Sequence, residues 1–237
     1  MIDEIPFPSP EQSGQIIITN VESPSEIHGQ LVSNLEEISQ LDVISNNLGE
    51  NLKGKTEEYL PTIGEVCAAE FADFGQYFRG VILKVNNNNK TAEVQFIDYG
   101  NKSIVPFVKI APLSKEHATL DRQAVQFSLF SGVSRVNWSK ECILDVKLCL
   151  LNKAASYVVT SKEENLIIAE INVEGEDANA RFAKYNPTHA SYQQQTVSET
   201  KKLTIPEAKQ LQLFTLSHQL STSTLVFQHS NCQNSAM

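Results

Sequence analysis

The sequence predicts a mainly β protein with helices, an α+β fold built around a small, strongly bent barrel. Four β-rich segments follow one another with short connections, at 65–71, 76–85, 91–97 and 102–107. They carry too little apolar mass for a sandwich, so a curved barrel is the arrangement they favour. The asparagine run at 86–89 suits a tight hairpin, because asparagine tolerates positive φ. Further β-rich segments stand on both sides of these four, and one helical segment precedes them.

The region before the barrel combines a strand pair with a helix. Residues 15–30, QIIITNVESPSEIHGQ, place a Ser-Pro turn after a β-branched run, which predicts a hairpin. Residues 33–52 carry apolar side chains near helical spacing, and Ser33 with Glu36 three residues later has the form of a capping box. We expect this helix to end near 47–49. Its apolar positions are Leu35, Ile38, Leu41, Ile44 and Leu48.

The region after the barrel returns to β-structure and then changes composition. Residues 113–126 resemble a short amphipathic element. Residues 192–237 are rich in Gln, Ser and Thr, and only 203–213 indicates a helix there. We interpret this last region as a flexible tail or the truncated start of a further unit. The strands expected before it are 127–133, 142–151, 156–160 and 166–173.

Charge and composition exclude several classes of function. The formal net charge is -9 and the pI is about 5.1, so clustered Lys and Arg for neutralising phosphates are not expected. A basic peptide suits such a field better than nucleic acid. The start of the chain carries acids and proline where a secretory signal needs a basic and then an apolar stretch. No apolar run approaches the roughly 20 residues of a membrane span, so we expect an intracellular, soluble chain.

Cysteine and histidine spacing does not indicate a metal or catalytic site. No pair of cysteines has the spacing of a zinc or redox motif, and the histidines stand one at a time. We therefore expect reduced and mostly buried thiols, no metal, no cofactor and no catalytic residue. The residues concerned are Cys67, Cys142, Cys149, Cys232, His28, His117, His189, His218 and His229.

The segment 64–101, GEVCAAEFADFGQYFRGVILKVNNNNKTAEVQFIDYGN, closely resembles the Tudor domain. Phe71 stands at the family's first cage aromatic. The run Tyr77-Phe78-Arg79-Gly80 stands for the family's Trp-Tyr-Arg-Ala signature, and Phe96-Ile97-Asp98-Tyr99-Gly100-Asn101 for its aromatic-x-Asp-Tyr-Gly-Asn signature. The chain departs from the pattern in having Tyr77 for tryptophan, Phe78 for the common tyrosine and Gly80 for alanine.

The resemblance extends to about residues 13–192 and implies an extended Tudor domain. In that arrangement, a Tudor β-barrel is joined by a long helix to a split OB-fold barrel like that of staphylococcal nuclease. The implied divisions are 13–60 for the first OB strands and linker helix, 61–112 for the Tudor barrel and 113–192 for the rest of the OB half. Residues 193–237 remain as the tail or further unit.

The resemblance also implies an aromatic cage for dimethylarginine, at Phe71, Phe78, Phe96 and Tyr99, with Asn101 as its polar member. A methylated guanidinium is flat and weakly hydrated, so aromatic faces attract it while its methyl groups bury apolar area. The Asn101 amide oxygen can accept a bond from a remaining guanidinium N–H.

Four further residues near this implied cage have supporting roles. Strand parity places residues 96 and 99 on opposite faces, so both reach one site only if the chain bends near Asp98, with Gly100 supplying a permissive backbone. We assign Arg79 and Asp98 a structural role, as an ion pair that braces the cage strands. Phe74 lies beside the first cage aromatic and is assigned to the rim of the pocket or to a cap on the barrel.

The function implied by the family is a methylarginine reader and not an enzyme. Its partners would be Arg-Gly or Arg-Ala tails of Piwi-class Argonaute proteins, and its location cytoplasmic germline granules (nuage) of the small-RNA (piRNA) pathway. Four alternatives stay open: a scaffold with an unused cage that binds by its acidic surface or by self-association, a methyl-lysine reader, an OB-fold RNA binder, and a metal-dependent nuclease. For the nuclease, no cluster of carboxylates can be placed on the OB strands.

Overall fold

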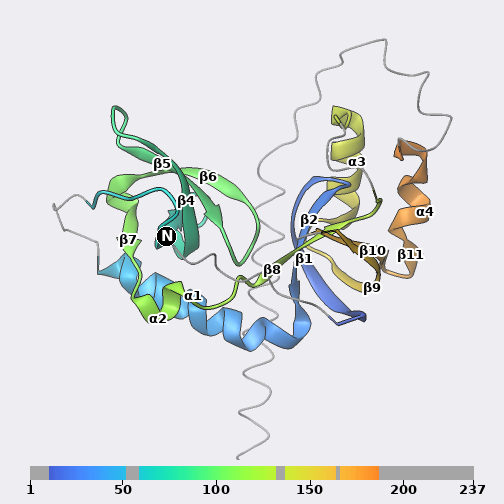
Figure 1. The fold of residues 1–237 in the computed structure, drawn as a ribbon, viewed down its shortest axis with the longest axis horizontal. Helices are drawn as coiled ribbons and strands as arrows, with labels where there is room; N and C mark the ends of the chain where they lie inside the picture. Colours follow the sequence, from blue (N-terminus) through green and yellow to red (C-terminus); the bar gives the residue numbers. More distant parts are fainter. Residues whose placement is uncertain (1–10, 52–58, 132–136, 164–165, 187–237) are drawn as a thin grey trace, which may run out of the picture. The chain divides into compact units, whose positions relative to one another are not determined.

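A computed structural model describes residues 11–51, 59–131, 137–163 and 166–186 (Figure 1). All of these residues belong to one compact unit. The tail and the helix expected at 203–213 therefore lie outside the described residues. Within them, no helix has the length and apolar character needed to cross a membrane.

One set of strands forms a barrel whose members come from two distant parts of the sequence, and we call it the split barrel. Its pairings run in a closed circle, β1 to β2, β8, β10, β9 and back to β1, and only the β8–β10 pairing is parallel. Alternating Ile16 and Ile18 of β1 point into its core with Ile27 and Phe127. The strands are β1 (Ser13–Ser23), β2 (Glu26–Leu31), β8 (Ala124–Ser128), β9 (Ala154–Glu163), β10 (Leu166–Val173) and β11 (Glu176–Asp177).

The second sheet, which we call the central barrel, has the strand order β6-β5-β4-β3-β7. The four expected strands are present, and β7, which was not expected, pairs with β3. Ala92, Val94 and Phe96 alternate inward along β5, while the residues between them are partly exposed. The strands are β3 (Val66–Phe71), β4 (Gln76–Asn86), β5 (Thr91–Phe96), β6 (Lys102–Pro106) and β7 (Ile110–Pro112).

The asparagine run forms the expected turn between β4 and β5, but by a different device. The positive φ of 52° falls on Lys90 and not on an asparagine. Asn86 contributes instead through its side chain, whose Oδ1 accepts a hydrogen bond from the Asn89 backbone N–H at 3.1 Å.

The helix between the two barrels, α1 (Leu35–Glu50), lies within the expected range, and it packs against β4 and β3 (Figure 1). The expected capping box is wrong: the N-cap residue is Asn34, and no side chain caps the helix. The Ser33 hydroxyl donates to the Asn34 side chain at 2.8 Å, and the Asn34 amide donates to Gln123 at 3.0 Å. The second of these bonds ties the N-cap residue to a part of the chain far away in the sequence.

The strand expected at 142–151 is also wrong, because Lys140–Leu150 forms a helix, α3. Its buried residues Cys142, Val146 and Leu150 recur every four positions, which is helical and not strand periodicity. Ser139 caps the helix by accepting from the Cys142 backbone N–H at 3.2 Å.

The remaining strand expectations are met in part. The strand expected at 127–133 is β8, which begins and ends earlier, and 132–136 lies outside the described residues. β10 has the expected bounds, and β9 is longer than expected. The short elements are α2 (Lys115–Ala118), α4 (Ala178–Phe182) and the 3-10 helices η1 (Val32–Asn34), η2 (Phe107–Lys109) and η3 (Ala183–Tyr185).

Candidate functional site

The structure brings the five aromatic residues of interest together at one end of the central barrel. Phe71 ends β3, Phe74 lies in the following turn, Phe78 is on β4, Phe96 ends β5 and Tyr99 lies in the turn after it. Their rings form a continuous series, which we call the aromatic cluster. Successive centroids are 5.4 Å apart for Phe74–Phe71, 5.4 Å for Phe71–Phe96, 6.3 Å for Phe96–Phe78 and 5.0 Å for Phe78–Tyr99.

Successive rings from Phe71 to Tyr99 meet at steep angles, whereas Phe74 is tilted by 40° from Phe71. Phe96 is nearly perpendicular to Phe71 and to Phe78, at 82° and 89°, and Tyr99 is at 66° to Phe78. Phe78 and Phe96 are only 3% and 1% exposed, whereas Phe71, Phe74 and Tyr99 are half-buried. A ligand would therefore reach the cluster from the side of the three half-buried rings.

A sharp turn lets Phe96 and Tyr99 join the same cluster. The Tyr99 and Gly100 backbone N–H groups both donate to the Phe96 carbonyl, at 3.2 and 2.7 Å, and Gly100 has φ +91°. This is the bend that strand parity required. Asn101 follows it and is half-buried, and its backbone carbonyl accepts from the Phe96 N–H at 2.9 Å.

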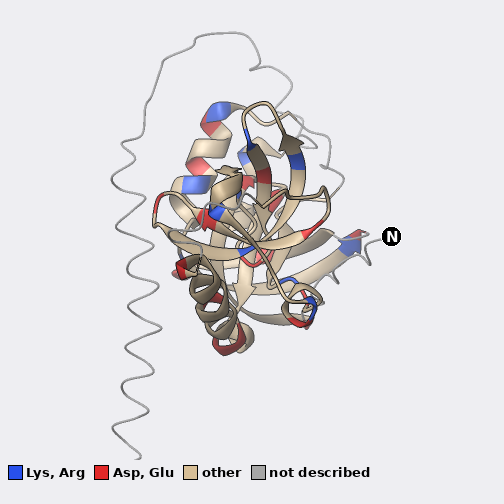
Figure 2. Cartoon of the chain, turned by 90° about the vertical axis from the view of Figure 1, so that its left-hand side faces the viewer, with Lys and Arg blue, Asp and Glu red and all other residues tan. Residues whose placement is uncertain are grey.

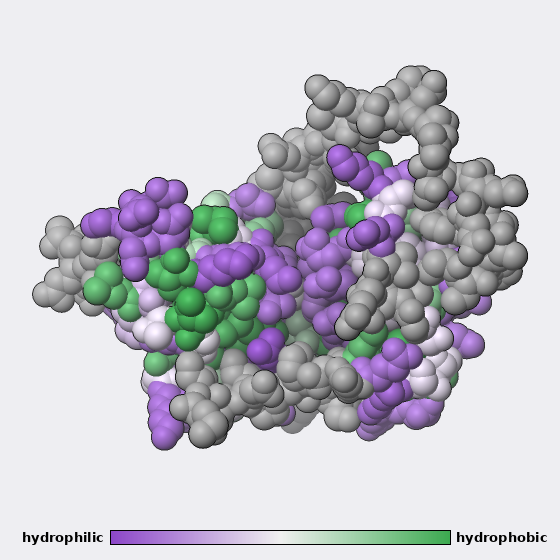
Figure 3. Space-filling model, turned by 45° about the horizontal axis from the view of Figure 1, so that its top comes forward, coloured by the Kyte–Doolittle hydropathy of each residue, from purple (hydrophilic) through white to green (hydrophobic). Residues whose placement is uncertain are grey.

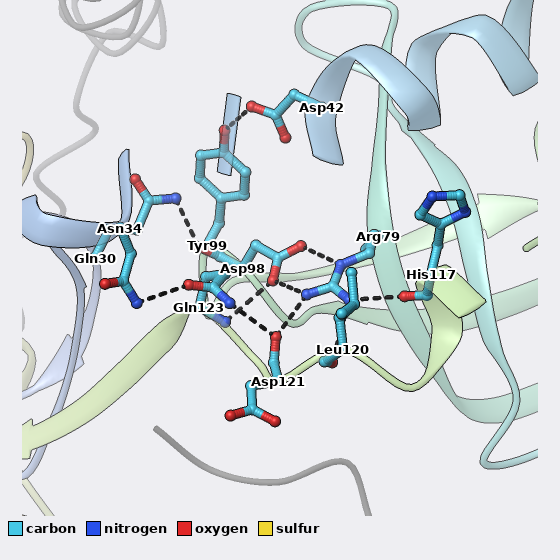
Figure 4. A network of polar contacts seen from close by, with 10 residues as sticks. All are labelled: Gln30, Asn34, Asp42, Arg79, Asp98, Tyr99, His117, Leu120, Asp121 and Gln123. Carbon is cyan, nitrogen blue, oxygen red and sulfur yellow. Dashed lines mark hydrogen bonds and ion pairs between the residues drawn. The ribbon is translucent and has the colours of Figure 1, made fainter. Parts of the chain in front are cut away.

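Arg79 and Asp98 form a fully buried ion pair beneath this turn, with side chains 1% exposed (Figure 4). The guanidinium donates to the carboxylate at 2.8 and 2.6 Å and to the carbonyls of His117, Leu120 and Asp121 at 2.9, 3.2 and 2.8 Å. These five bonds match the five donors of a guanidinium, so none is left for a ligand. Burial raises the pKa of Asp98, and the bonds from Arg79 oppose that rise.

Asp42 is a site residue that the sequence reasoning missed. It lies on the buried face of α1, is 8% exposed, and accepts a hydrogen bond from the Tyr99 hydroxyl at 2.6 Å (Figure 4). Burial raises the pKa of Asp42 to about 7, and burial together with Asp42 raises the pKa of Tyr99. The available signal was an acid beside Leu41, within the apolar stripe of the expected helix.

Residues of the split barrel hold the turn from its other side, and these too were missed. The Gln30 side-chain amide donates to the Asp98 carbonyl at 2.7 Å, and the Thr19 hydroxyl donates to the Tyr99 carbonyl at 2.7 Å. The His28 ring lies against Gly100, where an added Cβ would be 2.2 Å from the ring. Polar residues alternating with the apolar core residues of β1 and β2 were the signal for this contact.

A cavity of about 140 Å³ lies on the opposite face of β5 from Phe96, and no ring of the aromatic cluster lines it. Its lining includes Gln95 and Ile97, which flank Phe96 and point the other way. The cavity is therefore separate from the cluster. The other lining residues are His28, Gly100, Arg122, Ala124 and Gln126.

Along the ribbon drawn in Figure 2, Lys and Arg positions of the described residues are interspersed with Asp and Glu positions. Figure 3 shows hydrophobic residues gathered on the part of the surface that belongs to the central barrel. Ile104 and Val108 contribute exposed apolar side chains to that barrel, at 63% and 62% exposure. Within the described residues, no group of three or more His, Cys, Asp or Glu could hold a metal ion.

Comparison with known proteins identifies sequence relatives of this region. The chain is 28% identical to zebrafish Tudor domain-containing protein 1 over 166 residues, which is 69% of this chain and 14% of the relative. It is 29% identical to the human protein of that name over 161 residues, 66% of this chain and 14% of the relative. The chain thus spans about a seventh of the length of these relatives.

Solved structures of extended Tudor domains share the fold. The human TDRD1 domain in complex with a symmetrically dimethylated peptide has a TM-score of 0.63 at 21% identity, covering 74% of this chain and 89% of that one. The domain of BmPAPI in complex with sDMA has a TM-score of 0.64 at 20% identity, covering 75% and 98%. The third domain of mouse TDRD1 with a MILI peptide containing dimethylarginine has 0.62 at 19% identity, covering 73% and 89%.

These likenesses confirm the fold class expected from the sequence, a mainly β chain in which a helix joins two barrels. The family model described as "Tudor domain" matches residues 8–131, more than half of the chain. The chain belongs to the Tudor domain family.

Proposed function

We propose that this chain is a methylarginine reader that binds symmetrically dimethylated arginine in a cage formed by Phe71, Phe78, Phe96 and Tyr99, with Asn101 as the polar member. The observation that carries this proposal is the convergence of these four rings, from separate strands and a turn, into one series with steep interplanar angles. Phe74 extends the series at the rim.

The chemistry of the cluster suits a methylated guanidinium. Each aromatic face contributes roughly 0.5 to 2 kcal/mol to a cation contact, and the methyl groups bury apolar area against the rings. Methylation keeps the charge and lowers the cost of removing the group from water. The Asn101 amide oxygen supplies an acceptor for a remaining N–H.

The proposed partners are arginine-methylated Arg-Gly or Arg-Ala tails of Piwi-class Argonaute proteins, bound in cytoplasmic germline granules of the piRNA pathway. Support comes from the solved relatives, among them one with a MILI peptide containing dimethylarginine. The net charge of -9 favours a basic peptide as the ligand. In this role the chain is an adaptor and not an enzyme.

The test is a titration with one Arg-Gly peptide in unmodified, asymmetric and symmetric dimethyl forms. We expect the symmetric form to bind most tightly, and Phe96→Ala or Phe71→Ala to weaken binding by about two- to thirty-fold. Phe107→Ala is the matched control, because Phe107 lies in the same core outside the cluster. Thermal unfolding of each variant identifies loss of fold, and equal binding of all three peptide forms would contradict the proposal.

The near-complete burial of Phe78 and Phe96 favours one second candidate, a scaffold whose cage is unused. In that case partners would bind the outer surface or a second copy of the chain, and methylation would not matter. The same titration separates the two, because a scaffold binds unmodified and methylated peptides equally and is insensitive to Phe71→Ala.

A further inference from the structure

The helix α1 contacts the strand β4 and the turn after β5 through polar groups. The Asp42 carboxylate accepts from the Tyr99 hydroxyl at 2.6 Å, and the Asn46 side chain accepts from the Tyr77 backbone N–H at 2.9 Å, next to Phe78. The Asn46 amide in turn donates to the Asp42 carbonyl at 2.8 Å. One turn of α1 therefore contacts both Tyr77, the residue before Phe78, and the hydroxyl of Tyr99.

The position of Asp42 is costly for a carboxyl group. It shares the buried face of α1 with Ile38, Leu41, Ser45 and Gly49, and it is 8% exposed. An apolar side chain would satisfy that environment, whereas a buried carboxyl needs a hydrogen-bond partner. Within the described residues, its side-chain partner is the Tyr99 hydroxyl.

Tyr99 differs from the other three proposed walls in carrying a hydroxyl group. Phe71, Phe78 and Phe96 carry no hydroxyl, and the one tyrosine among the four is the ring that meets a carboxyl group on α1. The backbone of Tyr99 is also held, because its N–H donates to the Phe96 carbonyl and its carbonyl accepts from Thr19. Bonds at both ends of the residue fix the ring against Phe78.

We propose that Asp42 is a positioning residue for the methylarginine site, which holds Tyr99 as a wall of the cage and so makes α1 part of the binding machinery. This inference rests on the proposed function of the aromatic cluster. The hydroxyl of Tyr99 holds the ring in place through its bond to Asp42, and the face of the ring contacts the ligand.

Ionisation of Asp42 connects this role to pH. Burial raises the pKa of Asp42 to about 7, while the bond from Tyr99 and the charge of Arg79 lower it and Asp98 raises it. A cation in the cage favours the ionised carboxylate, so ligand affinity should rise as the pH rises through 7. A purely structural contact would not transmit this dependence.

The test compares the symmetric dimethylarginine peptide on the wild type, Asp42→Asn, Asp42→Ala, Tyr99→Phe and the double variant Asp42→Ala with Tyr99→Phe. We expect Asp42→Ala and Tyr99→Phe each to weaken binding by about tenfold, and the double variant to be no weaker than either, because all three lack the same bond. Asp42→Asn keeps an acceptor and should bind with no pH dependence between about pH 6 and 8. Glu37→Gln is the charge-matched control on the exposed face of α1.

The outcomes separate this inference from the proposed function. A wild type that does not distinguish the methylated peptide overturns both. A wild type that does so, with Asp42→Ala binding as tightly or the two single effects simply adding, overturns the role of Asp42 alone. Chemical denaturation shows which variants are folded at the temperature of the titration.

Discussion

At the scale of single residues, the site depends on close backbone contacts that only certain side chains permit. Gly80 illustrates this, because it stands where the Tudor signature has alanine. It pairs with Phe96 across the strands, and an added Cβ would lie 2.3 Å from Val94 Cγ1. An alanine at position 80 would therefore require Val94 to shift.

Gly100→Ala tests the turn that brings Tyr99 into the cluster. The residue has φ +91°, and an added Cβ would lie 2.2 Å from the His28 ring, so backbone strain and a collision act together. We expect a loss of roughly 2 to 4 kcal/mol in the free energy of unfolding, measured by chemical denaturation. Gly175→Ala is the control, because that glycine also has positive φ but nothing within 4 Å. Equal effects at the two positions would exclude the His28 contact as a cause.

Arg79→Lys tests the buried ion pair. Lysine keeps the charge but has three donors and no planar fork, so carbonyls near Asp98 would lose their partners. We expect the free energy of unfolding to fall by about 1 to 3 kcal/mol, the cost of leaving a buried polar group without its partner. Lys84→Ala, which removes an exposed pair with Glu93, should change it by less than about 1 kcal/mol. A small effect of Arg79→Lys would mean that water replaces the lost bonds.

At the scale of elements, α1 is defined more by what it packs against than by its own caps. It begins without a side-chain cap, and its first residues are held by the bond from Asn34 to Gln123. Its buried face includes a glycine and two polar residues, which local helix propensity does not favour. Contact with β3 and β4 therefore stabilises this helix in place.

Gly49→Ala separates propensity from packing in α1. Alanine in a helix is normally favoured over glycine by about 1 kcal/mol, but here the added Cβ would lie 2.1 Å from the Tyr77 ring. The collision with Tyr77 should outweigh the gain in helix propensity, so we expect a net loss of about 1 to 3 kcal/mol in the free energy of unfolding. The double variant with Tyr77→Ala should remove the collision, so that the alanine at position 49 becomes neutral or favourable. Thermal and chemical denaturation measure both, and a stabilising Gly49→Ala alone would contradict the packing argument.

At the scale of the whole molecule, two buried titratable groups respond to pH in opposite directions. Burial lowers the pKa of His28 to about 4, and burial raises the pKa of Asp42 to about 7. The histidine therefore costs stability as the pH falls from about 6.5 to 4, because the unfolded chain binds the proton more readily. Asp42 costs stability as the pH rises from about 4 to 7, because the unfolded chain releases the proton more readily.

The two single variants should reveal these opposing contributions. Relative to the wild type, Asp42→Asn should gain stability as the pH rises from about 4 to 7, and His28→Gln should gain stability as the pH falls from about 6.5 to 4. Each trend should amount to a few kcal/mol, since one unit of pKa corresponds to about 1.4 kcal/mol. Free energies of unfolding at several pH values across this range would measure them. Trends of the same sign in both variants would refute the assignment.

The sequence by itself determined the features that depend on neighbouring residues. A β-branched run with a Ser-Pro turn predicted the β1–β2 hairpin, and β-rich segments with short connections predicted the first four strands of the central barrel. The two signatures contain three of the rings that the structure brings together, Phe78, Phe96 and Tyr99. Strand parity also required a bend near Asp98, and Gly100 with φ +91° lies in that bend. The strand prediction at 142–151 was wrong although local signals for a helix were present, namely the four-residue spacing of Cys142, Val146 and Leu150 and the capping Ser139.

Only the tertiary structure decided which distant residues support the site. Asp42, Gln30 and Thr19 meet the turn around Asp98 and Tyr99 from elements far away in the sequence, and no spacing rule relates an acid on a helix to a hydroxyl 57 residues later. The physical reason is that burial removes water as a partner, so each polar group must find one through the fold. Residue types near the cage follow from local pattern, whereas their hydrogen-bond partners follow from how the chain closes on itself.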